Sequence, residues 1–127
     1  MMDEIDRTQL YNTVWRHWGA DTQLDIFIEE MAELTQAIIK ARRHSDTPYT
    51  ESFMEELADV CICIEQLKTR MRRLPRASKN HIVGDNGNNW DTVMEFKAEK
   101  LERLKGRLFE SLSKKYPGVG DHIEGWR

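Results

Sequence analysis

The chain has 127 residues, a mass of 15.0 kDa, and 19 basic against 22 acidic side chains. This length suits one domain, and we expect residues 1–127 to form it. The net charge of −3 argues against binding nucleic acid through overall positive charge. No apolar stretch approaches the roughly 20 residues of a membrane span, and no secretory signal is recognisable. We therefore expect a cytoplasmic protein with no membrane partner and no nucleic-acid partner.

Helical periodicity runs through most of the chain, without the alternation typical of strands. We predict helices over residues 4–18, about 22–43, about 48–73 and about 91–115. Their expected end signals are Gly19 after the first helix, a cap at Asp21 or Thr22, a cap at Thr47 followed by Pro48, and a cap at Asp91. Residues 75–90 form a predicted polar loop and residues 116–127 an irregular tail. This pattern predicts an all-α, four-helix bundle-like fold.

Two cysteines, Cys61 and Cys63, are too few and too close together for a disulfide framework. We expect both to be reduced thiols in small, buried, apolar positions.

One short segment is repeated with the same chemical character. Residues 27–34 read FIEEMAEL and residues 53–60 read FMEELADV, at an offset of 26 residues. At about 100° per residue, the apolar positions of each segment form one stripe. The acidic pairs Glu30/Glu33 and Glu56/Asp59 lie at the same angles beside their stripes. Two helices packed through these stripes are expected to bring the four carboxylates together.

Converging carboxylates repel one another unless a cation lies between them. Oxygen ligands favour hard ions such as Mg²⁺, Mn²⁺ or Ca²⁺. A di-iron bundle would need a Glu-x-x-His step, which no histidine of this chain completes, and no Cys/His set has zinc spacing. The sequence therefore favours a hard divalent cation. A solvated acidic helix face without a metal is the alternative interpretation.

Basic side chains line one edge of the fourth predicted helix. Lys100 and Arg103 follow Phe96 at helical spacing, with Lys97 beside them. These cations are candidates for contacting substrate phosphates, since guanidinium and ammonium groups pair well with phosphate oxygens. The alternative for Lys100 is a stem lying along apolar surface with its charge in water.

The motif Glu29-Glu30-x-x-Glu33, followed by Glu56-x-x-Asp59, resembles the signature of the MazG-like all-α nucleoside triphosphate pyrophosphohydrolases, in particular the small single-domain members of phages and bacteria. The resemblance covers roughly residues 14–73 and 96–109. It implies a helical bundle assembled as a homodimer or a dimer of dimers. It also implies hydrolysis of (deoxy)nucleoside triphosphates between the α- and β-phosphates, with Mg²⁺ as cofactor and Mn²⁺ as a substitute. The products would be a nucleoside monophosphate and pyrophosphate.

Carried over by position, the resemblance makes Glu30, Glu33, Glu56 and Asp59 both catalytic residues and metal ligands. Glu29 would bind a second ion or orient the attacking water.

Aromatic residues near the first acidic motif are candidates for stacking on a nucleobase. Trp15 and Trp18 precede that motif, and both also fit the apolar stripe of their own helix, so a core role is the alternative. Trp90, in the predicted polar loop, is a further candidate.

Apolar residues outside the two stripes, such as Ile39 and Ile62, predict a second partner face. We expect a homodimer that completes the core with the second and third helices of each copy. Two other classes of function stay open, namely a non-enzymatic helical interaction module and a divalent-metal-binding regulatory module without turnover. A basic run near the end of the third helix, between Lys68 and Arg76, is explained by favourable charge at a helix C-terminus.

Overall fold

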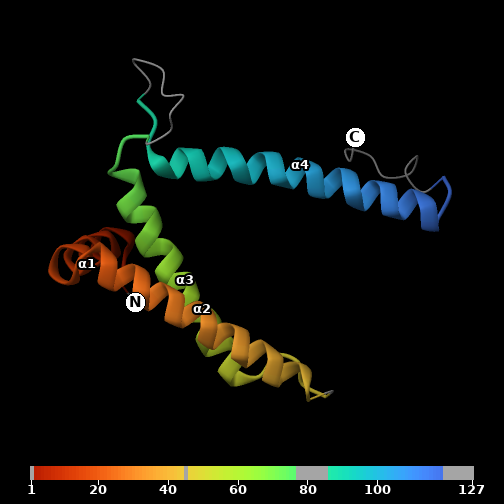
Figure 1. Cartoon of the computed structure of the whole chain (residues 1–127), viewed down its shortest axis with the longest axis horizontal. Helices are drawn as coiled ribbons and strands as arrows, with labels where there is room; N and C mark the ends of the chain where they lie inside the picture. The colour runs from red at the N-terminus through yellow and green to blue at the C-terminus, as the bar shows by residue number, and fades with distance from the viewer. Residues whose placement is uncertain (1, 45, 77–85, 119–127) are drawn as a thin grey trace. The chain divides into compact units, whose positions relative to one another are not determined.

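The computed structural model describes residues 2–44, 46–76 and 86–118 (Figure 1). Within these ranges the chain forms four helices and no strand, which confirms the prediction of an all-α fold. The helices are α1 (Glu4–Trp18), α2 (Ala20–Arg42), α3 (Glu51–Arg72) and α4 (Asn89–Lys115). An isolated bridge joins Pro75 to Asn88. None of the described helices has both the length and the apolar character that crossing a membrane requires.

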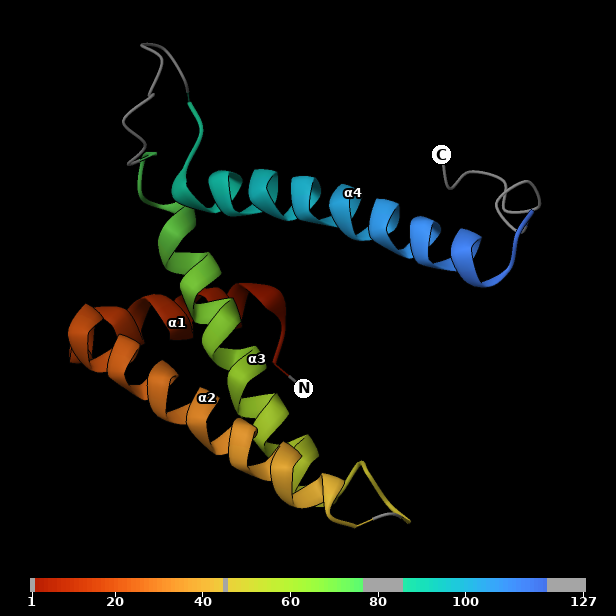
Figure 2. The same ribbon diagram turned by 45° about the vertical axis from the view of Figure 1, so that its right-hand side comes forward.

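The chain divides into two compact units, Met1–Leu74 and Pro75–Arg127. The first unit holds α1, α2 and α3, which pack on one another (Figure 2). The second unit holds α4. The prediction that residues 1–127 form one domain stays a prediction.

The turn between α1 and α2 is a single residue. Gly19 has a positive φ of 86°, which a side chain would disfavour, and its N–H donates to Trp15 O at 3.0 Å. This confirms Gly19 as the end of α1. The predicted cap of α2 at Asp21 or Thr22 is wrong, because α2 already begins at Ala20 and Gly19 is its N-cap without a side-chain hydrogen bond.

The predicted start of α3 is also wrong. Thr50, not Thr47, caps this helix, because its hydroxyl accepts a hydrogen bond from Phe53 N at 3.2 Å. Pro48 therefore lies before the helix. The predicted ends of α2 and α3 agree with the structure to within one residue.

Helix α4 begins with a reciprocal capping box. The Asn88 side chain accepts from Asp91 N, and the Asp91 side chain accepts from Asn88 N, both at 2.9 Å. The predicted cap at Asp91 is therefore wrong by three residues. In the same unit, Arg76 forms an ion pair with Glu95 at 2.8 Å.

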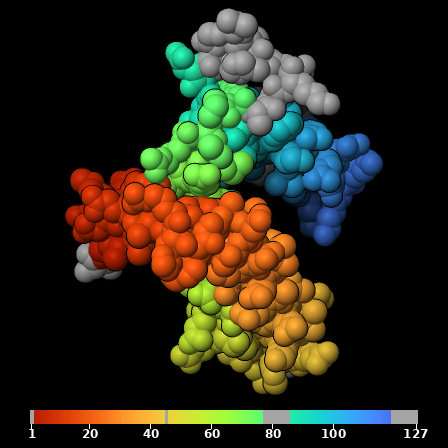
Figure 3. All heavy atoms as spheres, turned by 60° about the vertical axis from the view of Figure 1, so that its left-hand side comes forward, coloured from red at the N-terminus to blue at the C-terminus, as the bar shows by residue number. Residues whose placement is uncertain are grey.

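Two aromatic side chains of α1 hold it against α3. The indole N–H of Trp15 donates to Gln66 O at 2.9 Å, and the Tyr11 hydroxyl donates to Glu65. Both rings are buried. In the space-filling view, α1 in red abuts the first turns of α2 in orange (Figure 3). These contacts fix which face of α1 is turned towards the other two helices.

The interior of the first unit is small. Its buried apolar residues are Tyr11, Trp15, Ala37, Ala41, Val60 and Cys63. Larger apolar side chains of α2 and α3 are only partly covered, and Met31, Leu57 and Ile64 each keep more than 40% of their surface exposed. The small side chains of Ala37 and Ala41 are among the most enclosed, which suits a close approach of α2 to its neighbours.

Candidate metal centre and adjoining groove

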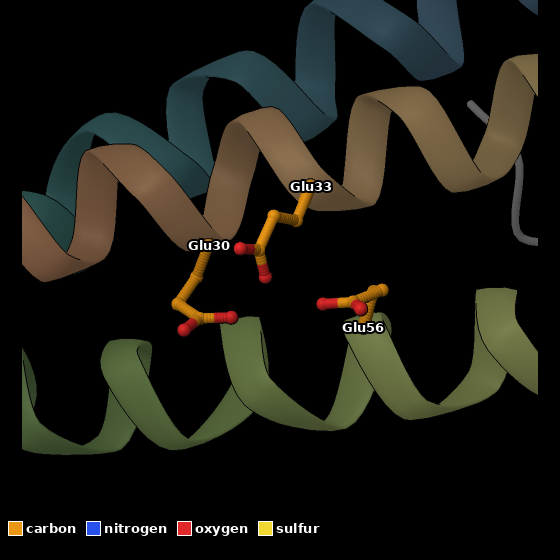
Figure 4. A group of neighbouring side chains, drawn as sticks. All are labelled: Glu30, Glu33 and Glu56. Atoms are coloured by element: carbon orange, nitrogen blue, oxygen red, sulfur yellow. The ribbon is translucent and has the colours of Figure 1, made fainter.

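The repeated acidic motif brings three carboxylates together between α2 and α3. Glu30 and Glu33 come from successive turns of α2, and Glu56 comes from α3 (Figure 4). One carboxylate oxygen from each residue lies within 4.8 Å of the other two. The prediction that Glu30, Glu33 and Glu56 meet across two helices therefore agrees with the structure. We call these three residues the acidic cluster.

Two carboxyl groups of the acidic cluster, those of Glu30 and Glu56, have a raised pKa. The pKa of Glu30 is raised by burial first and then by the charges of Asp59, Glu33 and Glu56. The pKa of Glu56 is raised by burial and by its neighbour Glu33. Burial and like charge both disfavour the ionised form of a carboxyl group. The cluster is thus an electrostatically unfavourable arrangement as long as nothing positive lies within it.

Two oxygen atoms of the cluster have no hydrogen-bond partner. Glu30 Oε2 and Glu56 Oε2 are both enclosed, and no described residue donates to either of them. Enclosed polar atoms are normally satisfied, so such an atom requires an explanation. A divalent cation would supply the missing partner for both oxygens, and oxygen-only ligands are those that hard cations take. The residues present therefore fit such an ion.

Asp59, the fourth predicted ligand, lies beside the acidic cluster. Its carboxylate is close enough to Glu30 for the two to share a hydrogen bond, and it acts electrostatically on both Glu30 and Glu56. The group of oxygens within 4.8 Å of one another does not include it. Glu29 is exposed on α2 and is likewise not a member of that group.

A groove of about 310 Å³ adjoins the acidic cluster within the first unit. Glu30 and Asp59 line its acidic part, and Trp18 from α1 lines its aromatic part. The Trp18 side chain is 57% exposed, and the His17 ring packs edge-on against it at 5.0 Å. The groove therefore holds an exposed aromatic side chain and two carboxylates in one continuous space.

The two tryptophans of α1 lie in different surroundings. Trp15 is only 7% exposed, and its indole N–H is already bonded to Gln66 O. This placement corresponds to the core role that the sequence left open for Trp15. Trp18 is the tryptophan of α1 that lines the groove.

Sequence reasoning missed other groove residues, namely Gln23, Ile26, Ile62, Cys63 and Gln66. Gln23 precedes Glu30 by seven residues and so shares its helix face, which was an available signal. Cys61 is exposed and Cys63 is buried, so the predicted burial is wrong for Cys61. The two positions lie on opposite sides of α3, so only one of the two cysteines can face α1 and α2.

The predicted phosphate-binding cations belong to the second unit. Lys97, Lys100 and Arg103 are all exposed on α4. Trp90 lies in the first turn of α4 rather than in a loop, because the capping box starts the helix at Asn89. Most of the predicted polar loop and of the predicted tail lies outside the described residues.

No family model, no curated protein and no solved structure matches this chain.

Proposed function

We propose that this protein is a divalent-metal-dependent nucleoside triphosphate pyrophosphohydrolase, similar to the MazG-like enzymes. It would hydrolyse (deoxy)nucleoside triphosphates between the α- and β-phosphates and release pyrophosphate. The observation that carries the proposal is the position of Glu30 and Asp59. Glu30 belongs to the acidic cluster, and both residues line the groove that holds Trp18. A metal-bound triphosphate and an attached nucleobase could therefore occupy adjoining parts of one surface.

In this proposal the carboxylates of the acidic cluster bind the cation that the anionic substrate needs. A triphosphate is strongly anionic, and the acidic cluster alone would repel it. A bound Mg²⁺ would supply positive charge against the phosphates and make a bound water more acidic. Glu30, Glu33 and Glu56 would hold that ion, and Asp59, which lies beside them, would be a further ligand. Glu29 is the remaining acidic candidate for orienting water.

The groove and the basic edge of α4 supply the other proposed contacts. Trp18 would stack on the nucleobase, since it is 57% exposed and lines the groove. Lys97, Lys100 and Arg103 of α4 stay candidates for contacting substrate phosphates because of their charge. Loss of any one of these three cations is expected to raise the KM for the triphosphate more than it lowers the melting temperature, because all three are exposed.

The apolar surface supports a homodimer as part of the proposal. Ile28, Met31, Ile39, Met54 and Ile62 each keep more than 40% of their surface exposed on α2 and α3. A second copy could cover these residues and complete a four-helix core. Sedimentation at micromolar concentration should then give a species of twice the 15.0 kDa chain mass, and a purely monomeric protein would contradict it.

The decisive experiment measures pyrophosphate and nucleoside monophosphate from a panel of nucleoside and deoxynucleoside triphosphates with Mg²⁺. Glu30→Gln, Glu56→Gln and Asp59→Asn should each abolish turnover and retain the helical circular dichroism signal. Glu99→Gln on α4 is the matched control and should leave turnover unchanged.

Two results would contradict the proposal. Pyrophosphate release that is unchanged in the acidic variants would refute the roles assigned to these residues. Stabilisation by Mg²⁺ without product from any nucleotide would instead identify a metal-binding regulatory module.

A further inference from the structure

A second cleft lies between α1 and α3 and shares no lining residue with the groove that holds Trp18. Its volume is about 160 Å³. Both walls belong to the first unit, whose helices α1 and α3 are joined by the hydrogen bonds of Tyr11 and Trp15. The cleft is therefore built from packed helices rather than from loops.

The two walls repeat one chemical pattern. Glu4, Arg7 and Thr8 line it from α1, and Glu65, Lys68 and Thr69 line it from α3. In each triplet the basic residue follows the glutamate by three positions and the threonine follows by four. Residues at these spacings share one face of a helix. Tyr11 and Arg72 extend the two faces by a further turn, each seven positions after its glutamate.

Most uncharged polar groups of the cleft already have partners. The Thr8 hydroxyl donates to Glu4 O and the Thr69 hydroxyl donates to Glu65 O, both at 3.0 Å. The Tyr11 hydroxyl donates to the Glu65 carboxylate, and burial together with this carboxylate raises the pKa of Tyr11 to about 12. Tyr11 therefore stays a neutral donor whose hydrogen is committed to Glu65.

The cations of the cleft have no such partners. Arg7, Lys68 and Arg72 line it, and none of the three forms an ion pair with any described carboxylate. The carboxylates of Glu4 and Glu65 also line the cleft. The cleft therefore carries three positive and two negative groups. Arg7 and Arg72 are exposed and Lys68 is half-buried, and three cations that line one small cleft from two helices are suited to an anion with several acceptor oxygens.

We propose that this cleft binds a small phosphate-bearing anion through Arg7, Lys68 and Arg72. A phosphate group presents three acceptor oxygens in different directions, which matches donors from two facing helices. Guanidinium groups pair with phosphate through two parallel hydrogen bonds, and an ammonium group binds it as a point charge. The limited volume and the carboxylates of Glu4 and Glu65 oppose an extended polyanion.

The test is titration calorimetry on the full chain in the presence of EDTA. EDTA removes divalent cations, so phosphate cannot bind through the acidic cluster, and the result is independent of the proposed hydrolase activity. Inorganic phosphate, pyrophosphate and adenosine monophosphate are the probes, and chloride at equal ionic strength is the blank. Tighter binding of the nucleotide than of inorganic phosphate would identify a nucleotide as the source of the phosphate, and equal binding would identify free phosphate.

Lys68→Gln and Arg72→Gln should each raise the dissociation constant by about tenfold, the effect of losing one charge-assisted hydrogen bond. Arg70→Gln is the matched control, since Arg70 is exposed on the same helix and does not line the cleft. It should leave binding unchanged, and circular dichroism should be identical for all variants. The proposal is overturned if no probe binds saturably, or if Arg70→Gln weakens binding as much as Arg72→Gln does.

Discussion

Neutralising Glu33 is expected to stabilise the metal-free protein. One of its carboxylate oxygens lies within 4.8 Å of a Glu30 oxygen. Two unit charges at this separation repel by about 1 kcal/mol in water and by about 3.5 kcal/mol at an effective dielectric constant of 20. Because Glu33 is exposed, screening by solvent favours the lower figure. Glu33→Gln should therefore raise the free energy of unfolding in EDTA by about 1 kcal/mol, or the melting temperature by about 4 °C.

The same substitution should weaken the response to Mg²⁺. A cation at 100 times its dissociation constant stabilises the folded state by about 2.7 kcal/mol. If loss of one of three carboxylates lowers affinity tenfold, the same Mg²⁺ concentration gives only about 1.4 kcal/mol. Glu33→Gln should thus be more stable than the native chain in EDTA and gain about half as much from Mg²⁺.

Urea denaturation in EDTA and in excess Mg²⁺ measures both the free energy of unfolding without the cation and the gain in that energy from Mg²⁺. Glu99→Gln removes an exposed carboxylate elsewhere and is the control for a general effect of net charge. A Glu33→Gln protein that is no more stable than the control in EDTA, and that gains as much from Mg²⁺ as the native chain, would refute the metal-centre interpretation.

Two further predictions follow from the groove and the cluster. Because the pKa values of Glu30 and Glu56 are raised, the folded state retains protons that the unfolded chain has released above about pH 4.5. Stability in EDTA should therefore fall as pH rises above that value, and a Glu30→Gln, Glu56→Gln double variant should show a flatter profile in urea denaturation. Trp15→Phe should lower the free energy of unfolding by about 1–3 kcal/mol, because it removes the indole donor to Gln66 O and makes a buried ring smaller. Trp18→Phe should change stability by less than about 0.5 kcal/mol, since that side chain is 57% exposed, and thermal denaturation of the pair compares them directly.

The helices were predictable from the sequence because their apolar positions repeat with helical period over several turns. The caps were less predictable, because neighbouring residues of similar chemistry compete for the same position. Thr47 and Thr50 both precede α3, and only the one whose hydroxyl reaches a backbone N–H three residues later becomes the cap. Asn88 and Asp91 are both good caps, and they bond to one another's backbone, so either residue could be assigned the role from sequence.

The acidic cluster could be predicted because two helices with the same motif at the same angles meet through matching faces. The groove could not be predicted, because it depends on how α1 approaches α3. That approach is set by Trp15 bonding to Gln66 O, a contact between positions 51 residues apart. The sequence left Trp15 and Trp18 as equal candidates for stacking, and only this packing contact separates them.

The acidic cluster is unfavourable for the first unit as long as no cation is bound, because like charges lie close together and two enclosed oxygens lack donors among the described residues. The buried apolar interior of this unit is small, and folded proteins are in general only marginally stable. Burying two carboxylate oxygens without donors lowers that margin further, and replacing a cluster carboxylate by an amide would relieve it. Residues that weaken a fold in isolation are typical of sites whose partner restores the balance on binding. Structural need alone would favour neutral side chains at these positions. A bound cation would remove this repulsion, and the response of Glu33→Gln to Mg²⁺ distinguishes such an ion from a solvated helix face.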